Sequence, residues 1–110
     1  MKRVVTGTAV FCIVTLTAAA ALADHAKGEK ISGKKEFEEH CAVCHKDGGN
    51  IVNKAKTLSK KDRDANGVKT VKDIVAKIRK PGPGMTEFDK KTVSDKEAEA
   101  IAKYIIKTFK

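Results

Sequence analysis

Hydrophobic residues recur at helical spacing along much of this sequence, most clearly in its last segment. After Ser94, apolar residues fall at positions i, i+3, i+4, i+7 and i+11, which are Ala98, Ile101, Ala102, Ile105 and Phe109. On a helix this spacing gathers them into one apolar stripe. Ser94 and Glu97 form the Ser-x-x-Glu pattern of a capping box. The sequence therefore predicts a helix that begins beside Ser94, reaches the end of the chain and buries one face.

Two other long helices and a short one are expected. The first runs from Ser32, a suitable N-cap residue, to about Ala42, with apolar positions at Phe37, Cys41 and Cys44. The second begins at Thr70 with a capping-box pattern and ends before Pro81, because proline interrupts a helix. Its apolar positions are Val71, Ile74, Val75 and Ile78. The short helix spans Ser59 to Ala65, ahead of an Asn-Gly turn.

The remaining segments after residue 23 are predicted to be loops. The glycines and both prolines concentrate in or beside two of them, Lys46 to Lys56 and Lys80 to Val93. No segment alternates between apolar and polar residues as a strand would. We therefore expect an all-α single domain, with three main helices and a short one joined by long loops.

Residues 1–23 follow the plan of a secretory signal peptide. Two basic residues precede an apolar run, and the segment closes on Ala21-Leu22-Ala23. An uncleaved membrane anchor is the alternative, but one glycine and four threonines weaken the apolar run. Cys12 follows a bulky residue, which argues against a lipoprotein signal. We expect export to the periplasm, a mature domain at residues 24–110 and no stable membrane insertion.

The composition of the expected mature domain leaves its core short of apolar material. The chain has 34% charged residues, 5% aromatic residues and no tryptophan, and the signal segment holds a large share of its hydrophobic residues. A domain this small buries only about 60 to 65% of its unfolded surface. Disulfides, a metal or a bulky cofactor usually complete such a domain, and a large enzyme is excluded.

The pentapeptide from Cys41 to His45 supplies the expected cofactor. Its pattern Cys-x-x-Cys-His, in an exported chain, is the attachment signature of c-type haem. Residues at i, i+3 and i+4 share one helix face, so Cys41 and Cys44 can bind two porphyrin vinyl groups while His45 reaches the iron. A redox-active dithiol or half of a zinc site are the alternatives. Because no second cysteine-histidine cluster follows, we expect one haem c.

Met85 is the expected sixth ligand of the haem iron. Apart from Met1 it is the only methionine, and it follows Pro81-Gly82-Pro83-Gly84, in which prolines restrict the backbone and glycines permit a close approach. Histidine with methionine is a known pair of haem ligands. A gap-filling core methionine is the alternative. His25 could compete from a flexible tail, whereas His40 is expected at the solvated surface.

Hydrophobic residues from the loops and the middle helix are expected to surround the haem. They are Ile51, Val52, Leu58, Ile74, Ile78 and Phe88. An apolar environment and a sulfur ligand both disfavour the extra charge of ferric iron, which predicts a positive reduction potential.

Across residues 31–110 the chain resembles the class I monohaem c-type cytochromes. The pattern Gly33-x3-Phe37-x3-Cys-x2-Cys-His follows the start of that family, and Tyr104 lies where the family places an aromatic residue. The resemblance implies first and last helices that cross at Gly33, with Phe37 against Ile101, Tyr104 and Ile105. The segments Asp47 to Val52 and Lys56 to Leu58, and Met85 with Phe88, look closest to the cytochrome c-six type. The chain departs from the family at Thr86, where proline is frequent, and between 88 and 94, which lack the usual Gly-Gly-Arg turn.

These features predict a periplasmic one-electron carrier rather than an enzyme. The expected mature domain has a net charge of +7, from 21 basic and 14 acidic residues, which indicates redox partner proteins with acidic docking faces, or simply a well-solvated lysine surface. We expect a monomer and no nucleic-acid partner, because basic residues do not interleave with aromatic ones. The alternative functions are a haem peroxidase-like enzyme and a ligand-sensing haem protein with a displaceable sixth ligand. The sequence shows no distal histidine or arginine for the first and no output domain for the second.

Overall fold

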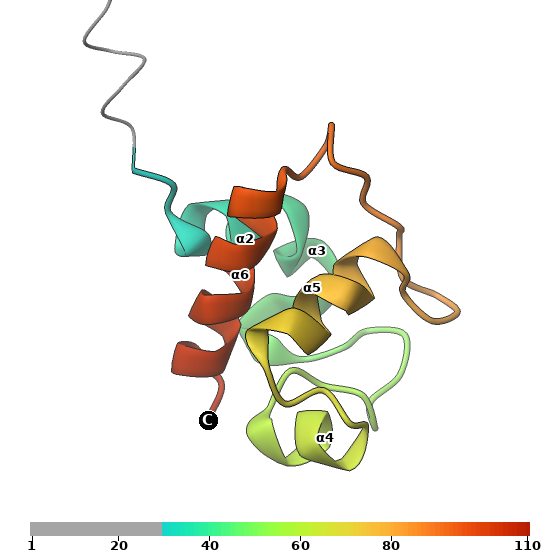
Figure 1. Cartoon of the computed structure of the whole chain (residues 1–110). Helices are drawn as coiled ribbons and strands as arrows, with labels where there is room; N and C mark the ends of the chain where they lie inside the picture. The colour runs from blue at the N-terminus through green and yellow to red at the C-terminus, as the bar shows by residue number, and fades with distance from the viewer. Residues whose placement is uncertain (1–29) are drawn as a thin grey trace, which may run out of the picture.

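The computed structural model of the protein describes residues 30–110 (Figure 1). The predicted signal peptide and His25 lie outside the described residues. Within them the chain is helical and contains no strand. The elements in chain order are α2 (Gly33–His40), α3 (Ala42–His45), the 3-10 helix η1 (Lys46–Gly48), α4 (Lys60–Ala65), α5 (Val71–Arg79) and α6 (Asp95–Thr108). The predicted all-α fold is confirmed, with three longer helices and short ones between them.

Helices α2 and α6 cross in close contact, as Figure 1 shows. A Cβ atom built on Gly33 would lie 2.2 Å from the carbonyl oxygen of Ala100, so only glycine allows this approach. The ring of Phe37 lies 5.3 Å from that of Tyr104, centroid to centroid. The crossing implied by the family resemblance is therefore confirmed.

The core lies where α2, α5 and α6 meet. Its buried hydrophobic residues are Phe37, Ile74, Ile78, Val93, Ala98, Ile101, Ala102 and Ile105. The first four positions of the predicted α6 stripe are buried, and Phe109 packs against the same cluster while half-buried. The helical periodicity thus identified the buried faces of both α5 and α6.

The helices begin at the predicted N-caps, but the first predicted helix is divided in two at Cys41. Both capping boxes form, Thr70 with Asp73 and Ser94 with Glu97. The predicted first helix does not continue smoothly to Ala42, because Cys41 has φ −118° and ψ −33° and separates α2 from α3. The Cys41 N–H still donates to the carbonyl oxygen of Phe37 at 2.9 Å, so the chain kinks without losing that hydrogen bond.

Long-range contacts fold the loops onto the helices. Leu58 N–H donates to the carbonyl oxygen of Gly48 at 2.8 Å, and a Cβ at Gly48 would lie 2.5 Å from the Phe109 ring. The segment between η1 and α4 is therefore held near the end of α6. Among residues 30–110, no helix combines the length and hydrophobicity needed to cross a bilayer.

Candidate functional site

A cavity of about 440 Å³ lies between the helices and the two long loops. Its volume is in the range typical of small-molecule and cofactor sites. Apolar side chains from the loops and from α5 and α6 make up much of the wall, among them Leu58, Val68, Ile74, Ile78, Ile101 and Ile105. The space that the composition left for a cofactor is thus present in the fold and lined mainly by apolar groups.

The predicted attachment residues Cys41, Cys44 and His45 all line this cavity. Both thiols are free of disulfide bonds, and burial raises the pKa of Cys41 to about 11. Redox-active dithiols and zinc sites need an accessible thiolate with a lowered pKa. The surroundings of Cys41 favour an uncharged sulfur, such as a thioether, over either of those alternatives.

A local turn orients the imidazole of His45. Its Nδ1 atom lies 2.7 Å from the carbonyl oxygen of Gly49. Since a carbonyl oxygen only accepts hydrogen bonds, Nδ1 is the donor, and in the neutral imidazole Nε2 then offers its lone pair to a metal. Asp47 and Gly48 adopt positive φ values of 54° and 79°, which turn the chain back towards the ring. A histidine held this way is oriented as a metal ligand.

Met85 lines the same cavity from the loop between α5 and α6. Arg79 holds this loop, because its Nη1 donates to the carbonyl oxygens of Phe88 at 3.1 Å and of Val93 at 2.8 Å. Gly84 has φ 89°, and a Cβ there would lie 2.7 Å from the Val52 side chain. The glycine before the methionine therefore allows both the turn and the close approach that the sequence predicted.

The predicted packing residues divide into two groups. Val52, Leu58, Ile74, Ile78 and Phe88 line the cavity. Ile51 does not, and 69% of its surface is exposed. Ile51 N–H donates to the carbonyl oxygen of Cys44, so this residue ties the loop to the attachment motif through its backbone.

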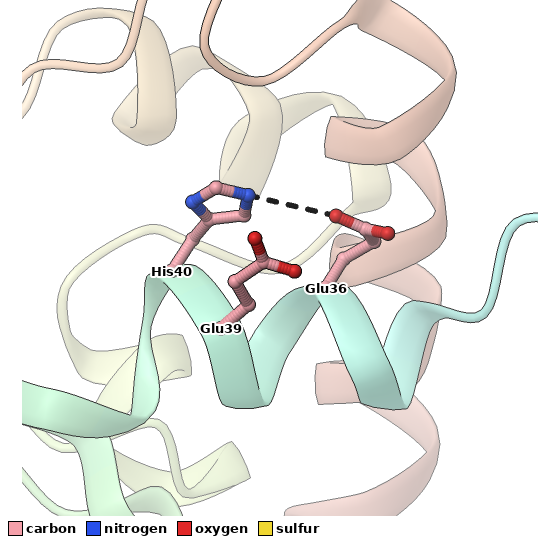
Figure 2. Close-up of side chains that lie close together, drawn as sticks. All are labelled: Glu36, Glu39 and His40. Carbon is pink, nitrogen blue, oxygen red and sulfur yellow. Dashed lines mark ion pairs between the residues drawn. The ribbon is translucent and has the colours of Figure 1, made fainter.

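The expectation that His40 is a solvated surface residue is wrong. Only 20% of its side chain is exposed, its ring meets that of Phe88 edge-on at 6.0 Å, and it contributes to the cavity wall. Phe88 reaches it from a distant loop, a contact that helix position alone does not reveal. Figure 2 shows the pair between His40 and Glu36, 3.6 Å apart, with Glu39 beside it on α2.

The sequence did not single out two further residues at the site. Arg63 on α4 lines the cavity and is only 5% exposed, but nothing local distinguishes it among 23 lysines and arginines. Asn50 organises the loop after η1, because its Oδ1 accepts the N–H groups of Val52 and Asn53 at 2.9 Å. An Asn that follows a Gly-Gly pair is a turn signal, so Asn50 could have been noticed.

Comparison with known proteins places the chain in a family. Residues 28–105 match the family model described as cytochrome c oxidase, cbb3-type, subunit III. Cytochrome c6 of a Synechocystis species is 35% identical over 106 residues, which cover 96% of this chain and 88% of that relative. Cytochrome c6 of Leptolyngbya boryana is 40% identical over 75 residues, covering 68% and 87%.

Solved structures give the same result. OmcF, the outer membrane cytochrome F of Geobacter sulfurreducens, is 43% identical with a TM-score of 0.70, and the match covers 72% of this chain and all of that one. Cytochrome c6C of a Synechococcus species is 32% identical with a TM-score of 0.66, covering 70% and 93%. The match in structure extends over most of the helical domain.

The family evidence and the site agree on the cofactor. Proteins of this family carry one covalent haem c and transfer electrons rather than act as enzymes. The apolar cavity, the paired thiols and the oriented imidazole fit such a group. The chain belongs to the cytochrome c family, as a class I monohaem member close to cytochrome c6 and a small haem c electron carrier.

Proposed function

We propose that this protein is an exported one-electron carrier whose haem is bound through Cys41 and Cys44, with His45 and Met85 as the iron ligands. One observation carries the proposal: these four side chains line one cavity, although Met85 comes from a separate loop. Bound haem supplies the redox chemistry, as its iron alternates between ferric and ferrous states.

The protein's own residues keep the two ligands in place during electron transfer. The hydrogen bond from His45 Nδ1 to Gly49 fixes the imidazole. Arg79 fixes the ends of the loop that carries Met85. Apolar side chains such as Leu58 and Ile78 exclude water from the cavity. Ligands held this firmly change little between redox states, which favours fast electron transfer.

A potentiometric titration of the purified protein tests the ligand assignment. Methionine sulfur and an apolar cavity both favour ferrous iron, so the midpoint is expected to be positive. The reduced protein should also resist carbon monoxide, because Met85 occupies the sixth position. A strongly negative midpoint, or ready binding of carbon monoxide, would favour a peroxidase-like or ligand-sensing haem protein instead.

Charge supports a proposal about partners. Residues 24–110 hold 21 lysines and arginines and 14 aspartates and glutamates, a net charge of +7. This charge favours redox partner proteins with acidic docking faces and acts mainly on the association rate. Electron transfer to such a partner should slow steeply as salt is added, while a partner bound by apolar contacts would show little change. We propose that the carrier acts as a monomer, which sedimentation of the haem-loaded protein would test.

Residues 1–23 support a proposed location in the periplasm. Their charged, apolar and small-residue regions are those of a cleaved secretory signal. Intact mass of the exported protein should correspond to a chain beginning at Asp24 with one haem added. A mass that retains the first 23 residues would show a membrane anchor instead.

A further inference from the structure

The loop that carries Met85 is fixed to the rest of the protein at few points. Of residues 82–90, only Met85 and Phe88 are partly buried, and the others are exposed. In the described part of the chain, residues 81–87 make one hydrogen bond, from Met85 N–H to the carbonyl oxygen of Gly82 at 3.4 Å, which lies within the loop. Phe88 is the nearest residue after Met85 that bonds to another element, because its N–H donates to the carbonyl oxygen of Ile78 at 3.1 Å. The position of Met85 therefore depends on how firmly Phe88 is held.

Phe88 is held through its backbone by one helix and through its ring by another. Its carbonyl oxygen accepts a hydrogen bond from Arg79 of α5 at 3.1 Å. Its ring meets that of His40 of α2, with centroids 6.0 Å apart and an interplanar angle of 72°. This edge-to-face geometry is one that aromatic pairs prefer. Because His40 directly precedes Cys41, the ring contact joins the attachment motif to the Met85 loop.

Glu36 restrains the imidazole that makes this contact. The Nε2 atom of His40 lies 3.6 Å from Oε2 of Glu36 (Figure 2), and residues four positions apart share a helix face. Only 20% of the His40 side chain and 16% of the Glu36 side chain are exposed. The imidazole is therefore confined between a carboxylate of its own helix and the ring of Phe88.

We propose that His40 is a positioning residue for the ligand Met85. Its ring holds Phe88 at the cavity wall, and Phe88, three residues after Met85, keeps the loop closed over the sixth iron position. This inference rests on the proposed function, because it needs Met85 as an iron ligand. His40 acts through Phe88 and not on the iron. It controls how often the methionine leaves, while the identity of the ligand stays the same.

The rate at which Met85 leaves the iron tests the proposal. At high carbon monoxide concentration, binding to the reduced haem-loaded protein is limited by this step. His40→Gln removes the ring but keeps an amide that can donate to Glu36. It should raise the limiting rate roughly two- to tenfold, the effect of losing one aromatic pair. His40→Tyr, which restores an aromatic edge and a polar tip, should restore the slow rate.

Two outcomes of these substitutions would contradict the role of His40. One is an unchanged limiting rate in folded His40→Gln. The other is a rate in folded His40→Tyr as high as that of His40→Gln, because the aromatic edge would then be irrelevant.

A double-mutant cycle distinguishes positioning from a general loss of stability. Phe88→Leu keeps an apolar side chain but removes the ring, so adding His40→Gln to it should change the rate little. Gly33→Ala destabilises the crossing of α2 and α6 without touching this contact, and it should leave the rate low. Independent, multiplicative effects of His40→Gln and Phe88→Leu would overturn the proposal, as would an equal acceleration by Gly33→Ala.

Measurements on the unaltered protein separate this inference from the proposed function. Nuclear Overhauser effects between the ring protons of His40 and Phe88 are expected in the reduced haem-loaded protein, and their absence would overturn the proposal even if no variant folds. A carbon monoxide rate that rises without limit as its concentration increases would contradict Met85 as the ligand and thus the proposed function. A low limiting rate that does not depend on His40 would contradict only the positioning role.

Discussion

The two proposed iron ligands reach the cavity from walls that are held in different ways. His45 adjoins both cysteines, and its ring is oriented by the carbonyl of Gly49 only four positions away. Met85 lies in a loop whose form depends on Arg79, a residue of another element, which binds the carbonyls of Phe88 and Val93. The first wall is built by local chain geometry, and the second by long-range contacts. When the structure is disturbed, the loop that carries Met85 should therefore lose its conformation before the segment that carries His45 does.

The largest effect is expected from the double variant Cys41→Ala with Cys44→Ala. Without covalent haem the cavity of about 440 Å³ loses its filling, and the loss should approach the whole stability of a small domain, about 5 to 15 kcal/mol. Far-ultraviolet circular dichroism should show a largely unfolded chain. Val43→Ala, in the same motif but 81% exposed, should stay folded. A cooperative, helical, haem-free double variant would contradict this account of the composition.

Removing the Met85 side chain should free the sixth iron position, while the attachment through Cys41, Cys44 and His45 stays intact. In Met85→Ala the haem remains attached, but the sixth position is vacated, so the reduced protein should bind carbon monoxide readily and its midpoint should fall. Thr86→Ala, the adjacent position, should keep the behaviour of the unaltered protein. If Met85→Ala still resists carbon monoxide, another residue is the sixth ligand.

The same contrast explains what the sequence could predict. The capping boxes and the α6 stripe are encoded by residues of one short segment each, and the predictions for them agree with the fold. The attachment motif is equally local, and its three residues line one cavity. The surroundings of His40 and Arg63 depend on distant segments, because the Phe88 ring packs against His40 and the Phe109 carbonyl oxygen accepts a hydrogen bond from Arg63. Ile51 lies outside the cavity wall with 69% of its surface exposed, a position that its apolar character alone does not indicate.

Loosening the loop without removing its methionine should give an intermediate effect. Arg79→Gln removes charged hydrogen bonds to the Phe88 and Val93 carbonyls, which is expected to cost about 3 kcal/mol of unfolding free energy. Carbon monoxide should then displace Met85 severalfold faster. Asp95→Asn weakens the exposed ion pairs of Asp95 with Arg79 and Lys90 but keeps the two carbonyl bonds of Arg79, so it should leave that rate nearly unchanged. Equal rates in the two variants would show that Arg79 does not hold the loop.

Disturbing the crossing of α2 and α6 should lower the unfolding free energy of the whole domain. It should not affect the Met85 side of the cavity more than the His45 side. Gly33→Ala places a Cβ against the Ala100 carbonyl, and such overpacking costs roughly 1 to 3 kcal/mol. Urea denaturation should show this loss, while carbon monoxide binding stays slow in the folded protein. Gly82→Ala, where a Cβ meets nothing within 4 Å, is the matched control. Similar stability of the two variants would mean that the crossing is not tightly packed.

The smallest effect is expected from pH acting on the cap of α6, where the methionine loop ends. The hydrogen bond from Ser94 N–H is the main cause that lowers the pKa of Glu97. Because the pKa of Glu97 is lower in the folded than in the unfolded protein, its ionised carboxylate stabilises the fold at pH values above the unfolded pKa, about 4.3 for glutamate. This contribution is lost as the pH falls through the folded-state pKa. Glu97→Gln should therefore flatten the decline of the melting temperature in acid. Glu38→Gln, at an exposed position of α2, should leave that decline unchanged.

The central claim is that one haem is attached covalently through Cys41 and Cys44 and that the sulfur of Met85 is a ligand of its iron. Absorption spectra of the oxidised and reduced protein, recorded before and after acid-acetone extraction, test both parts at once. We expect haem that resists extraction and a ferric spectrum containing the weak long-wavelength band of an iron-methionine sulfur bond, absent in Met85→Ala. Extractable haem would contradict attachment through Cys41 and Cys44, and a ferric spectrum without that band would contradict Met85 as the ligand.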